Sequence, residues 1–474
     1  MKKYNQFFIN GEFVTPHGKE ILDLISPITD EKMAEVTLGD EVDLNNAVAA
    51  AKECFKTFRY STAKERQDIL RAWKESLLAR REDLINVTID EYGGAQVFVP
   101  FSIDTAIEDL QTMIDLLDTY QFERKVGIST VILNPIGVVG AIIPWNASNL
   151  FFCSKVSTAI AAGCPTVIKP SEMSAGQTQI MMECLAAANI PAGLVNVVNG
   201  TGMVIGNAIT NHKDIAKITF TGSTNVGKTI ARGAVDTLKR VTLELGGKSP
   251  NIILDDADLE KVIPEAIGAA FMNSGQACIA ATRLLVPASK LKEVNAIAKR
   301  AVETQQIAGD PHDSDVTVGP AVSQTQYARV QEYIRVGLEE DKAELLVGGL
   351  GRPEGLTKGN FTRPTIFTNV NNKMRIAQEE IFGPVLCIIP YNDEADAIRI
   401  ANDTQYGLMA YISSSNEERA LRIAKLVEAG QVKINNPFGH DNKAPFGGVK
   451  QSGLGREYGE FGISAYLEPK SILE

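Results

Sequence analysis

The stretch "TGSTNVGKT", residues 221–229, decides which class of fold the chain belongs to. An apolar run, "IAKITF", precedes it, and "IARGAVDTL" follows it with apolar residues at helical spacing. Together these segments predict a strand, a glycine-rich turn and a helix, the unit from which nucleotide-binding α/β folds are built. Gly222, Gly227, Lys228 and Thr229 also fit G-x-x-x-x-G-K-[ST], the phosphate loop of ATP and GTP hydrolases.

Three interpretations of this turn are open from its residues alone. It could be a true phosphate loop, with "NIILDD" at 251–256 supplying a magnesium-binding aspartate. It could be a helix N-terminus that holds a dinucleotide pyrophosphate without hydrolysis. It could also be a plain strand-to-helix turn with a solvated lysine. Short motifs of common residues match by chance, so the rest of the chain has to decide.

The alternation of strand and helix patterns continues on both sides of the turn. Upstream, "PTVIKP" and "VNVVNG" are typical of strands, and "AGQTQIMMECLAAANI" is typical of a helix. A second alternating region follows residue 246, with strand patterns in "PNIILDD", "TRLLVP" and "GPVLCIIPY". Such alternation predicts an α/β fold with parallel sheets. Further helices are expected at 42–58, from 63, and at 103–120, 257–274 and 289–307, and the end, "SAYLEPKSILE", is expected to be extended.

Composition narrows the functional classes. The 474 residues carry a formal net charge of −11, which argues against a general nucleic-acid or anionic-membrane binder. The N-terminus lacks the apolar core of a secretory signal, and apolar stretches such as "GVVGAIIPW" are too short to cross a bilayer, so we expect a cytoplasmic protein. The six cysteines and four histidines are scattered, which argues against zinc sites, C-x-x-C redox motifs and any other metal site.

Three residues at predicted turns and strand ends are candidates for chemistry. Cys278 lies in "NSGQACIAATR", on a predicted loop that would expose its thiol, although a single cysteine is most often a small buried hydrophobe. Glu244 ends a strand before two glycines, where an acid is more often a cap or an ion-pair partner. Asn146 ends "IIPWN", where an asparagine usually satisfies its own turn.

Seven motifs, taken in order, are more specific than any one of these residues. They are "PWN" (144–146), "KPSE" (169–172), "FTGSTNVG" (220–227), "LELGGK" (243–248), "GQAC" (275–278), "EEIFGP" (379–384) and "PFGG" (445–448). In these motifs, and over nearly its whole length, the chain resembles the aldehyde dehydrogenase superfamily. The resemblance implies a Rossmann-like NAD(P)-binding domain (1–116 and 138–245), an α/β catalytic domain (246–448) and a small β oligomerisation element (117–137 and 449–474). It also implies a homodimer or homotetramer.

The resemblance assigns roles to the three candidates. Cys278 would attack the aldehyde as a thiolate, forming a thiohemiacetal that becomes a thioester when hydride leaves. The amide of Asn146 and the backbone N–H of Cys278 would form the oxyanion hole, where one donor can contribute about 3 kcal/mol. Glu244 would be the general base that activates water to hydrolyse the thioester. Because it carries this acid, the chain resembles the hydrolytic members and not those that acylate coenzyme A.

The resemblance also implies a cofactor site and favours NAD, with NADP as an alternative. A carboxylate such as Glu172 bonds a ribose 2′-hydroxyl and repels a 2′-phosphate, whereas the nearby Lys169 would tolerate the phosphate. The expected contacts run along the whole dinucleotide: Ile143, Trp145, Lys169, Glu172, Gly222, Ser223, Gly227, Glu380 and Phe382. For Phe382, plain core packing is the alternative. On this interpretation 221–229 is a dinucleotide turn and "NIILDD" an ordinary buried strand.

The chain departs from the family pattern where the resemblance places the substrate tunnel. Many relatives have an aromatic residue directly after "PWN" and a tryptophan eight residues after the asparagine, whereas this chain has Ala147 and Ser154. These changes predict a wider, less apolar tunnel, with Phe151 and Phe446 as apolar walls and His440 either lining the pocket or satisfied in its loop. We therefore expect a bulkier or partly polar aldehyde. The rival hypotheses are a nucleoside triphosphatase that uses 222–229 and a non-catalytic relative that keeps only the fold.

Overall fold

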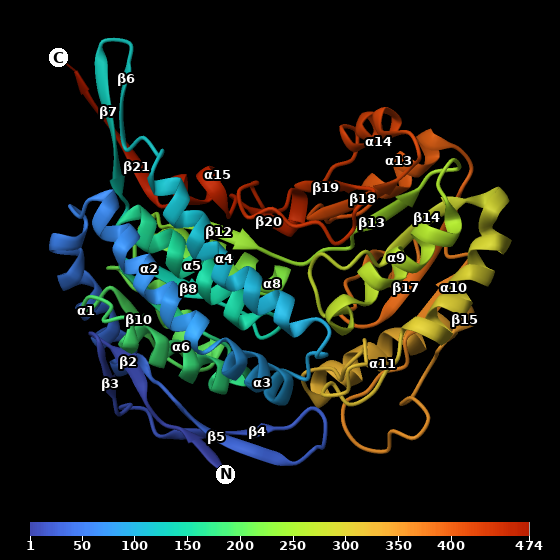
Figure 1. The fold of residues 1–474 in the computed structure, drawn as a ribbon, viewed down its shortest axis with the longest axis horizontal. Coiled ribbons are helices and arrows are strands. Elements are labelled where there is room, and N and C mark those ends of the chain that lie inside the picture. Colours follow the sequence, from blue (N-terminus) through green and yellow to red (C-terminus); the bar gives the residue numbers. More distant parts are fainter. Residues whose placement is uncertain (474) are drawn as a thin grey trace.

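The chain forms two lobes, each built around one large sheet, and a narrow ribbon of strands projects from one end (Figure 1). The structure is a computed structural model that describes residues 1–473. Among these residues, no helix combines the length and the apolar character needed to cross a lipid bilayer. The mixed α/β architecture predicted from the alternating patterns is confirmed.

The first lobe is built on an eight-stranded sheet in the order β20-β12-β11-β8-β9-β10-β2-β3. Its five central strands are parallel, and β20, β2 and β3 join antiparallel. The strands are β2 (Phe7–Ile9), β3 (Glu12–Val14), β8 (Val139–Ile142), β9 (Thr166–Lys169), β10 (Val195–Val197), β11 (Lys217–Thr221), β12 (Arg240–Glu244) and β20 (Gly453–Leu454). The chain runs outward from β8 to β9 and β10, then returns to add β11 and β12 on the other side. The crevice between β8 and β11 is therefore a topological switch point, where open α/β sheets bind ligands.

Helices cover both faces of this sheet. One face packs against a buried cluster contributed by α1 (Glu41–Phe58), α7 (Asn207–Asn211) and α8 (Thr224–Ala234). The other face packs against a larger cluster centred on Trp73. Its helices are α2 (Ala63–Ala79), α3 (Arg81–Tyr92), α4 (Val99–Leu117), α5 (Ser148–Ala162) and α6 (Ala175–Ala187). The arrangement is a doubly wound α/β fold, whose parallel central strands agree with the parallel sheet that the sequence patterns predicted.

The second lobe is built on a seven-stranded sheet in the order β15-β16-β17-β14-β13-β18-β19. All its neighbours are parallel except β15 and β16. The strands are β13 (Pro250–Ile253), β14 (Arg283–Pro287), β15 (Glu344–Val347), β16 (Thr365–Thr368), β17 (Val385–Tyr391), β18 (Met409–Ser413) and β19 (Gln431–Ile434). The helices are α9 (Leu259–Phe271), α10 (Leu291–Gln305), α11 (Gln324–Glu339), α12 (Arg375–Gln378), α13 (Glu394–Asn402) and α14 (Glu417–Ala424). The first two cover one face and the rest the other.

Two small antiparallel or mixed sheets complete the chain. Near the N-terminus, β1 (Lys2–Tyr4), β5 (Lys32–Leu38) and β4 (Glu20–Ile25) form one of them. The projecting ribbon is the other, with β21 (Leu467–Leu473) paired along its full length to β7 (Ser129–Pro135), and β7 paired to β6 (Glu123–Val126). The end of the chain is thus extended, as predicted, after the short helix α15 (Gly459–Ser464). Because β20 belongs to the first lobe's sheet, 449–474 is not one structural piece, and the domain boundaries stay a prediction.

Candidate active site

Two hollows meet at Cys278. The large cleft, of about 700 Å³, lies between the lobes and is lined by residues from both. The second cavity, of about 120 Å³, approaches the same thiol from the side of α4 and α5. Asn146, Phe151 and Cys278 border both hollows. A reagent in the large cleft and a different one in the second cavity can therefore both reach the sulfur.

A strained turn presents Cys278 to both hollows. Asn273, Ser274 and Gly275 have φ values of 52°, 57° and 70°, so three successive residues lie in the left-handed region, which non-glycine residues rarely adopt. A Cβ on Gly275 would lie 2.2 Å from the carbonyl oxygen of Gly383. This turn ends the predicted helix 257–274 early, at Phe271, and leaves the cysteine partly exposed on a loop.

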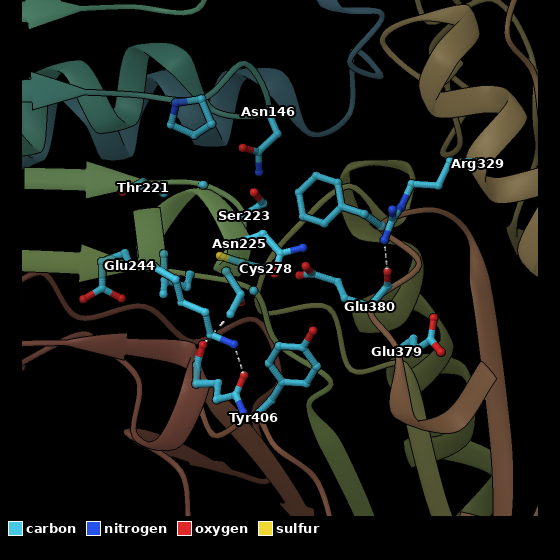
Figure 2. Close-up of a pocket in the computed structure, with 18 of the residues that line it drawn as sticks. Asn146, Thr221, Ser223, Asn225, Glu244, Cys278, Arg329, Glu379, Glu380 and Tyr406 are labelled. Atoms are coloured by element: carbon cyan, nitrogen blue, oxygen red, sulfur yellow. Dashed lines mark hydrogen bonds between the residues drawn. The ribbon is translucent and has the colours of Figure 1, made fainter. Parts of the chain in front are cut away.

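The side chain of Gln276 holds the same loop in place through two hydrogen bonds. Its Nε2 donates to the hydroxyl of Tyr92 at 3.1 Å, and its Oε1 accepts from the backbone N–H of Val322 at 3.0 Å. The backbone carbonyl of Gln276 accepts from Nδ2 of Asn146 at 2.9 Å, and the carbonyl of Asn146 accepts from Nδ2 of Asn273, also at 2.9 Å. The cysteine loop and the "PWN" loop are thereby joined, and Figure 2 shows the Asn146 amide pointing into the site.

The thiol of Cys278 is protonated at rest. Burial, followed by the carboxylates of Glu380 and Glu244, raises its pKa to about 12, although the backbone N–H groups of Cys278 and Ile279 oppose the shift. A thiolate is the reactive form, so the site needs a base or an added positive charge to generate one.

Glu244, the general base that the sequence predicts for hydrolysis of the thioester, lies at the end of β12. Its side chain borders the large cleft but is otherwise buried, and neither carboxyl oxygen has a hydrogen-bond partner among the described residues. Desolvation, followed by the nearby Glu457, raises the pKa of Glu244 well above the usual range. Glu457, the acid that contributes to this pKa shift, pairs with the buried ammonium of Lys155 and accepts a hydrogen bond from the Thr219 hydroxyl at 3.0 Å.

The large cleft has the size and shape of a cofactor site. Trp145 and Phe382 form one wall, with their rings edge to face at 5.5 Å, and Phe382 has a left-handed φ of 65°. It is half-buried and faces the cleft, so plain core packing does not describe it. Glu380 reaches the opposite wall, where its Oε1 accepts from the N–H of Gly247 at 3.0 Å. A Cβ on Gly246 would come within 2.3 Å of that carboxylate, so a larger residue there would displace the Glu380 side chain.

The motif at 221–229 has the geometry of a dinucleotide turn. Gly222 and Ser223 line the cleft, and Ser223 caps α8, whose first N–H groups form a site suited to an anionic group. From Thr224 onward the chain is helical, so it does not form the open loop that would wrap a triphosphate. Lys228 donates to Oε1 of Gln451 at 2.7 Å. Gly227 packs against Leu245, which a Cβ would meet at 2.5 Å, and does not border the cleft.

The remaining expected cofactor residues lie beyond the walls of the large cleft. Ile143 is buried next to the end of β8. Lys169, at the end of β9, donates to the Pro170 carbonyl at 2.7 Å and pairs with Glu172 at 3.3 Å. Burial lowers the pKa of Lys169, while the Glu172 carboxylate opposes that shift.

Four of the five expected substrate-pocket residues border the second cavity: Ala147, Phe151, His440 and Phe446. Ser154 does not border it, whereas Tyr458 does, and the Tyr458 ring packs against Phe446 at 5.8 Å and His440 at 6.2 Å. Burial lowers the pKa of His440, which favours the neutral imidazole.

Gln326 and Arg329 on α11 also border the cleft, and sequence reasoning missed them. Arg329 donates to the carbonyl of Glu380 at 2.7 Å (Figure 2). Gln326 donates to the carbonyl of Phe382 at 2.7 Å, so both side chains hold the "EEIFGP" loop. Their only signal in the sequence is an i, i+3 spacing on a helix, which is shared by many surface residues.

Comparisons with known proteins agree on one family. The profile of the Aldehyde dehydrogenase family matches residues 13–472. A 3-succinoylsemialdehyde-pyridine dehydrogenase from a Pseudomonas species is 41% identical over 475 residues, covering 100% of this chain and 99% of that protein. A structure of aldehyde dehydrogenase C from Pseudomonas syringae, a cysteine-to-alanine mutant with NAD+ and octanal, superposes with a TM-score of 0.97 at 40% identity, covering 99% of this chain and 96% of that one.

A second solved structure gives the same result. An aldehyde dehydrogenase of Mycobacterium tuberculosis, complexed with NAD+, superposes with a TM-score of 0.95 at 37% identity and covers 100% of this chain and 98% of that one. Nothing in these matches supports the nucleoside triphosphatase hypothesis, and the helical geometry of 224–229 removes its structural basis. The chain belongs to the aldehyde dehydrogenase family.

Proposed function

We propose that this protein oxidises an aldehyde to the carboxylic acid, with NAD+ in the large cleft and the aldehyde in the second cavity. The observation that carries the proposal is the position of Cys278, which borders both hollows together with the amide of Asn146. The glycines at 246 and 247, the cap of α8 and the Trp145–Phe382 wall fit a dinucleotide. When bound, NAD+ supplies the oxidant, taking a hydride from the carbon that is attached to sulfur.

The residues of the chain supply the other steps. The thiol of Cys278 gives its proton to water, and Glu244 is kept for the later hydrolysis of the thioester. The sulfur bonds to the aldehyde carbon, and the resulting oxyanion accepts from the N–H of Cys278 and from the amide of Asn146. One amide hydrogen of Asn146 already goes to the Gln276 carbonyl, so the second remains for the oxyanion.

Loss of hydride leaves a thioester on Cys278, which water must cleave. Glu244 accepts a proton from that water as it attacks the thioester carbon, and the acid departs as the sulfur regains a proton. Because the carboxyl oxygens of Glu244 are unpartnered among the described residues, no competing hydrogen bond holds them away from that water.

Three finer points belong to the same proposal. NAD is favoured over NADP because Glu172 would repel a 2′-phosphate, although its partner Lys169 offsets part of that charge. A homodimer or homotetramer is proposed from the projecting ribbon, whose Ile128 and Leu473 side chains are 77% and 75% exposed. A cytoplasmic location is in keeping with six cysteines that are all free thiols.

The test is reduction of NAD+ and NADP+, followed by absorbance, with a panel of aliphatic, aromatic and polar aldehydes. We expect turnover by the parent, faster with NAD+, and none by Cys278→Ala. Cysteine-to-alanine is a small change at a partly exposed loop position, so circular dichroism of the variant should match the parent. Turnover by folded Cys278→Ala would contradict the proposed nucleophile, and a folded, reduced parent that reduces neither cofactor with any aldehyde would contradict the proposed activity.

A further inference from the structure

The second cavity is apolar near the thiol and polar at its far side. Phe151, Phe446 and Ile279 surround the approach to Cys278. The polar groups come from the edge strand β19, whose Gln431 and Lys433 both border the cavity. In the sheet, β19 is three strands from β14, the strand that follows Cys278, and three strand spacings amount to about 14 Å.

The register of the sheet explains why a lysine faces this cavity. Met409 and Tyr411 of β18 point to one face, where they join a small apolar cluster beside Cys278. Gln431 is paired with Met409 and Lys433 with Tyr411, so both polar side chains lie on that same face. The Lys433 ammonium lies 5.7 Å from the centre of the Tyr411 ring, and the Tyr411 hydroxyl donates to the carbonyl of Ile279 at 2.8 Å.

The Lys433 ammonium has no counter-ion among the described residues. Its one hydrogen bond goes to the Pro437 carbonyl at 3.2 Å, which leaves donor capacity unused. Two acids lie near it: Asp441 borders the same cavity and Glu265 borders a small hollow on the other side of the lysine, yet neither is within ion-pair distance. The Oδ1 of Asp441 accepts from its own loop, at the N–H of Lys443. Desolvation lowers the pKa of Lys433 to about 8, so the fold holds this cation at a cost in free energy.

The buried lysines of the described chain are accounted for differently from the half-buried Lys433, and Lys239 among them donates to the Thr237 hydroxyl. Lys155 pairs with Glu457, and Lys169 with Glu172. Lys217 donates to the Thr242 hydroxyl at 2.6 Å. Lys248 also lacks a partner in the described residues, but the hollow beside it has a volume of only about 10 Å³, too small for a substrate. Lys433 differs from these lysines because it borders the second cavity, which reaches Cys278, and has no ion-pair partner among the described residues.

We propose that the substrate is an aldehyde that carries a carboxylate at its other end, with the carboxylate bound by Lys433 and the aldehyde carbon at Cys278. This inference rests on the proposed function. Gln431 adds an amide donor beside the ammonium, and His440, held neutral, adds an imidazole. The Lys433 ammonium can compensate the charge of one carboxylate, whereas a phosphate dianion would leave a further negative charge in a cavity that Asp441 also borders. The aromatic walls require an apolar linker between the two ends.

The test compares ω-oxo acids of four to eight carbons with unbranched alkanals of the same length, in the parent and three variants. Lys433→Met keeps the length of the side chain and removes the charge, and Lys433→Arg keeps the charge. Lys443→Met is the matched control, because Lys443 is exposed in the adjoining loop and does not border the cavity. Turnover of alkanals by each variant shows that it is folded and that the catalytic residues still act.

The parent should prefer the oxo acid at its best chain length by about tenfold or more in kcat/KM, the value of one charge-assisted hydrogen bond. Lys433→Met should lose about that factor through KM, with kcat for the alkanal preserved, while Lys433→Arg and Lys443→Met keep the preference. A parent with equal kcat/KM for the two series, or an undiminished preference in Lys433→Met, would overturn the proposal. Failure of the proposed function is distinct, because the parent would then reduce NAD+ with neither series.

A binding measurement separates recognition from catalysis. Linear dicarboxylates of the same lengths, which are the expected products, should slow the alkylation of Cys278 by iodoacetamide in the parent and in Lys443→Met. They should give no protection in Lys433→Met. Equal protection in Lys433→Met would overturn the role of this lysine even if no aldehyde is turned over.

Discussion

At the scale of single residues, the site depends on two acidic groups whose neutral, protonated form is favoured by burial. Glu244 is a buried carboxyl without a hydrogen-bond partner in the described chain, and Cys278 is a thiol whose pKa burial raises to about 12. Both groups are therefore protonated over a wider range of pH than they would be in water. Each becomes reactive only when it loses its proton, so a proton must leave Cys278 or Glu244 before that group can act.

Glu244→Gln should separate the two halves of the reaction. We expect a burst of about one reduced cofactor per site, because acylation leaves a thioester, followed by steady turnover lowered about 10²- to 10⁴-fold through loss of the base. Because the pKa of Glu244 is raised, its basic form is lost as the pH falls through that raised value, so steady turnover of the parent should increase as the pH rises through it. The burst is measured by stopped-flow absorbance, and Cys278→Ala should give none. Steady turnover equal to that of the parent would exclude Glu244 as the base.

At the scale of elements, the turn at 273–275 decides whether the thiol faces the two hollows. Its conformation comes from contacts distant in sequence, since Gly275 lies against Gly383 and Gln276 is bonded to Tyr92 and Val322. Such a turn is rigid because several segments determine it at once, and the strain it stores is offset by those contacts.

Gly275→Ala should destabilise the protein and abolish turnover. The new Cβ would lie 2.2 Å from the Gly383 carbonyl oxygen and would also carry the cost of a φ of 70°. Gly355→Ala is the matched control, with a φ of 84° and no atom within 4 Å of the added Cβ. The control should lose about 1–2 kcal/mol, the cost of a left-handed residue, and Gly275→Ala distinctly more. Urea unfolding with parallel assays measures both, and equal losses would show that the contact with Gly383 is not limiting.

The same elements show how far sequence reasoning reaches. The helix predicted at 42–58 is α1, and the helix at 289–307 is α10, because both have strong apolar periodicity on one face. The helix predicted to 274 ends at Phe271, because the left-handed turn that follows is fixed by tertiary contacts and has no local signal. Motifs brought Cys278, Glu244 and Asn146 to attention, and the structure brings Asn146 and Cys278 together at the junction of two hollows.

The parts of the site that could not be predicted come from distant segments. Tyr458 borders the second cavity and Ser154, 304 residues earlier in the sequence, does not, so the small residue at 154 does not by itself widen the cavity. In the sequence, Lys433 resembles any polar residue of a strand. Only the register of β18 and β19 shows that it lies beside Tyr411. Single-sequence patterns record periodicity and local turns, and these neighbours depend on neither.

At the scale of the whole molecule, the projecting ribbon has little to hold it in one chain. Both outer strands, β6 and β21, have an unpaired edge in the described chain, and most of their side chains are exposed (Figure 1). Open strand edges with apolar side chains are surfaces that pair with other chains unless something covers them. The ribbon is thus the feature that favours a homo-oligomer, and the two hollows at Cys278 are complete within one chain.

Replacing Ile128 and Leu473 together by lysine should therefore convert the oligomer into monomers. Each apolar side chain buried at an interface contributes about 1.5–3 kcal/mol to the free energy of association. In a two-fold interface each substitution occurs twice, so its cost is doubled. The four added lysine charges would also repel one another across that interface. Sedimentation velocity over a range of concentrations measures the assembly. Val235→Lys is the control, since Val235 is 65% exposed on another part of the surface and should leave the assembly unchanged. The monomer should keep its turnover, because neither introduced lysine lies near a hollow. An unchanged sedimentation coefficient would place the interface elsewhere. A monomer without activity would show that the partner chain supports the site.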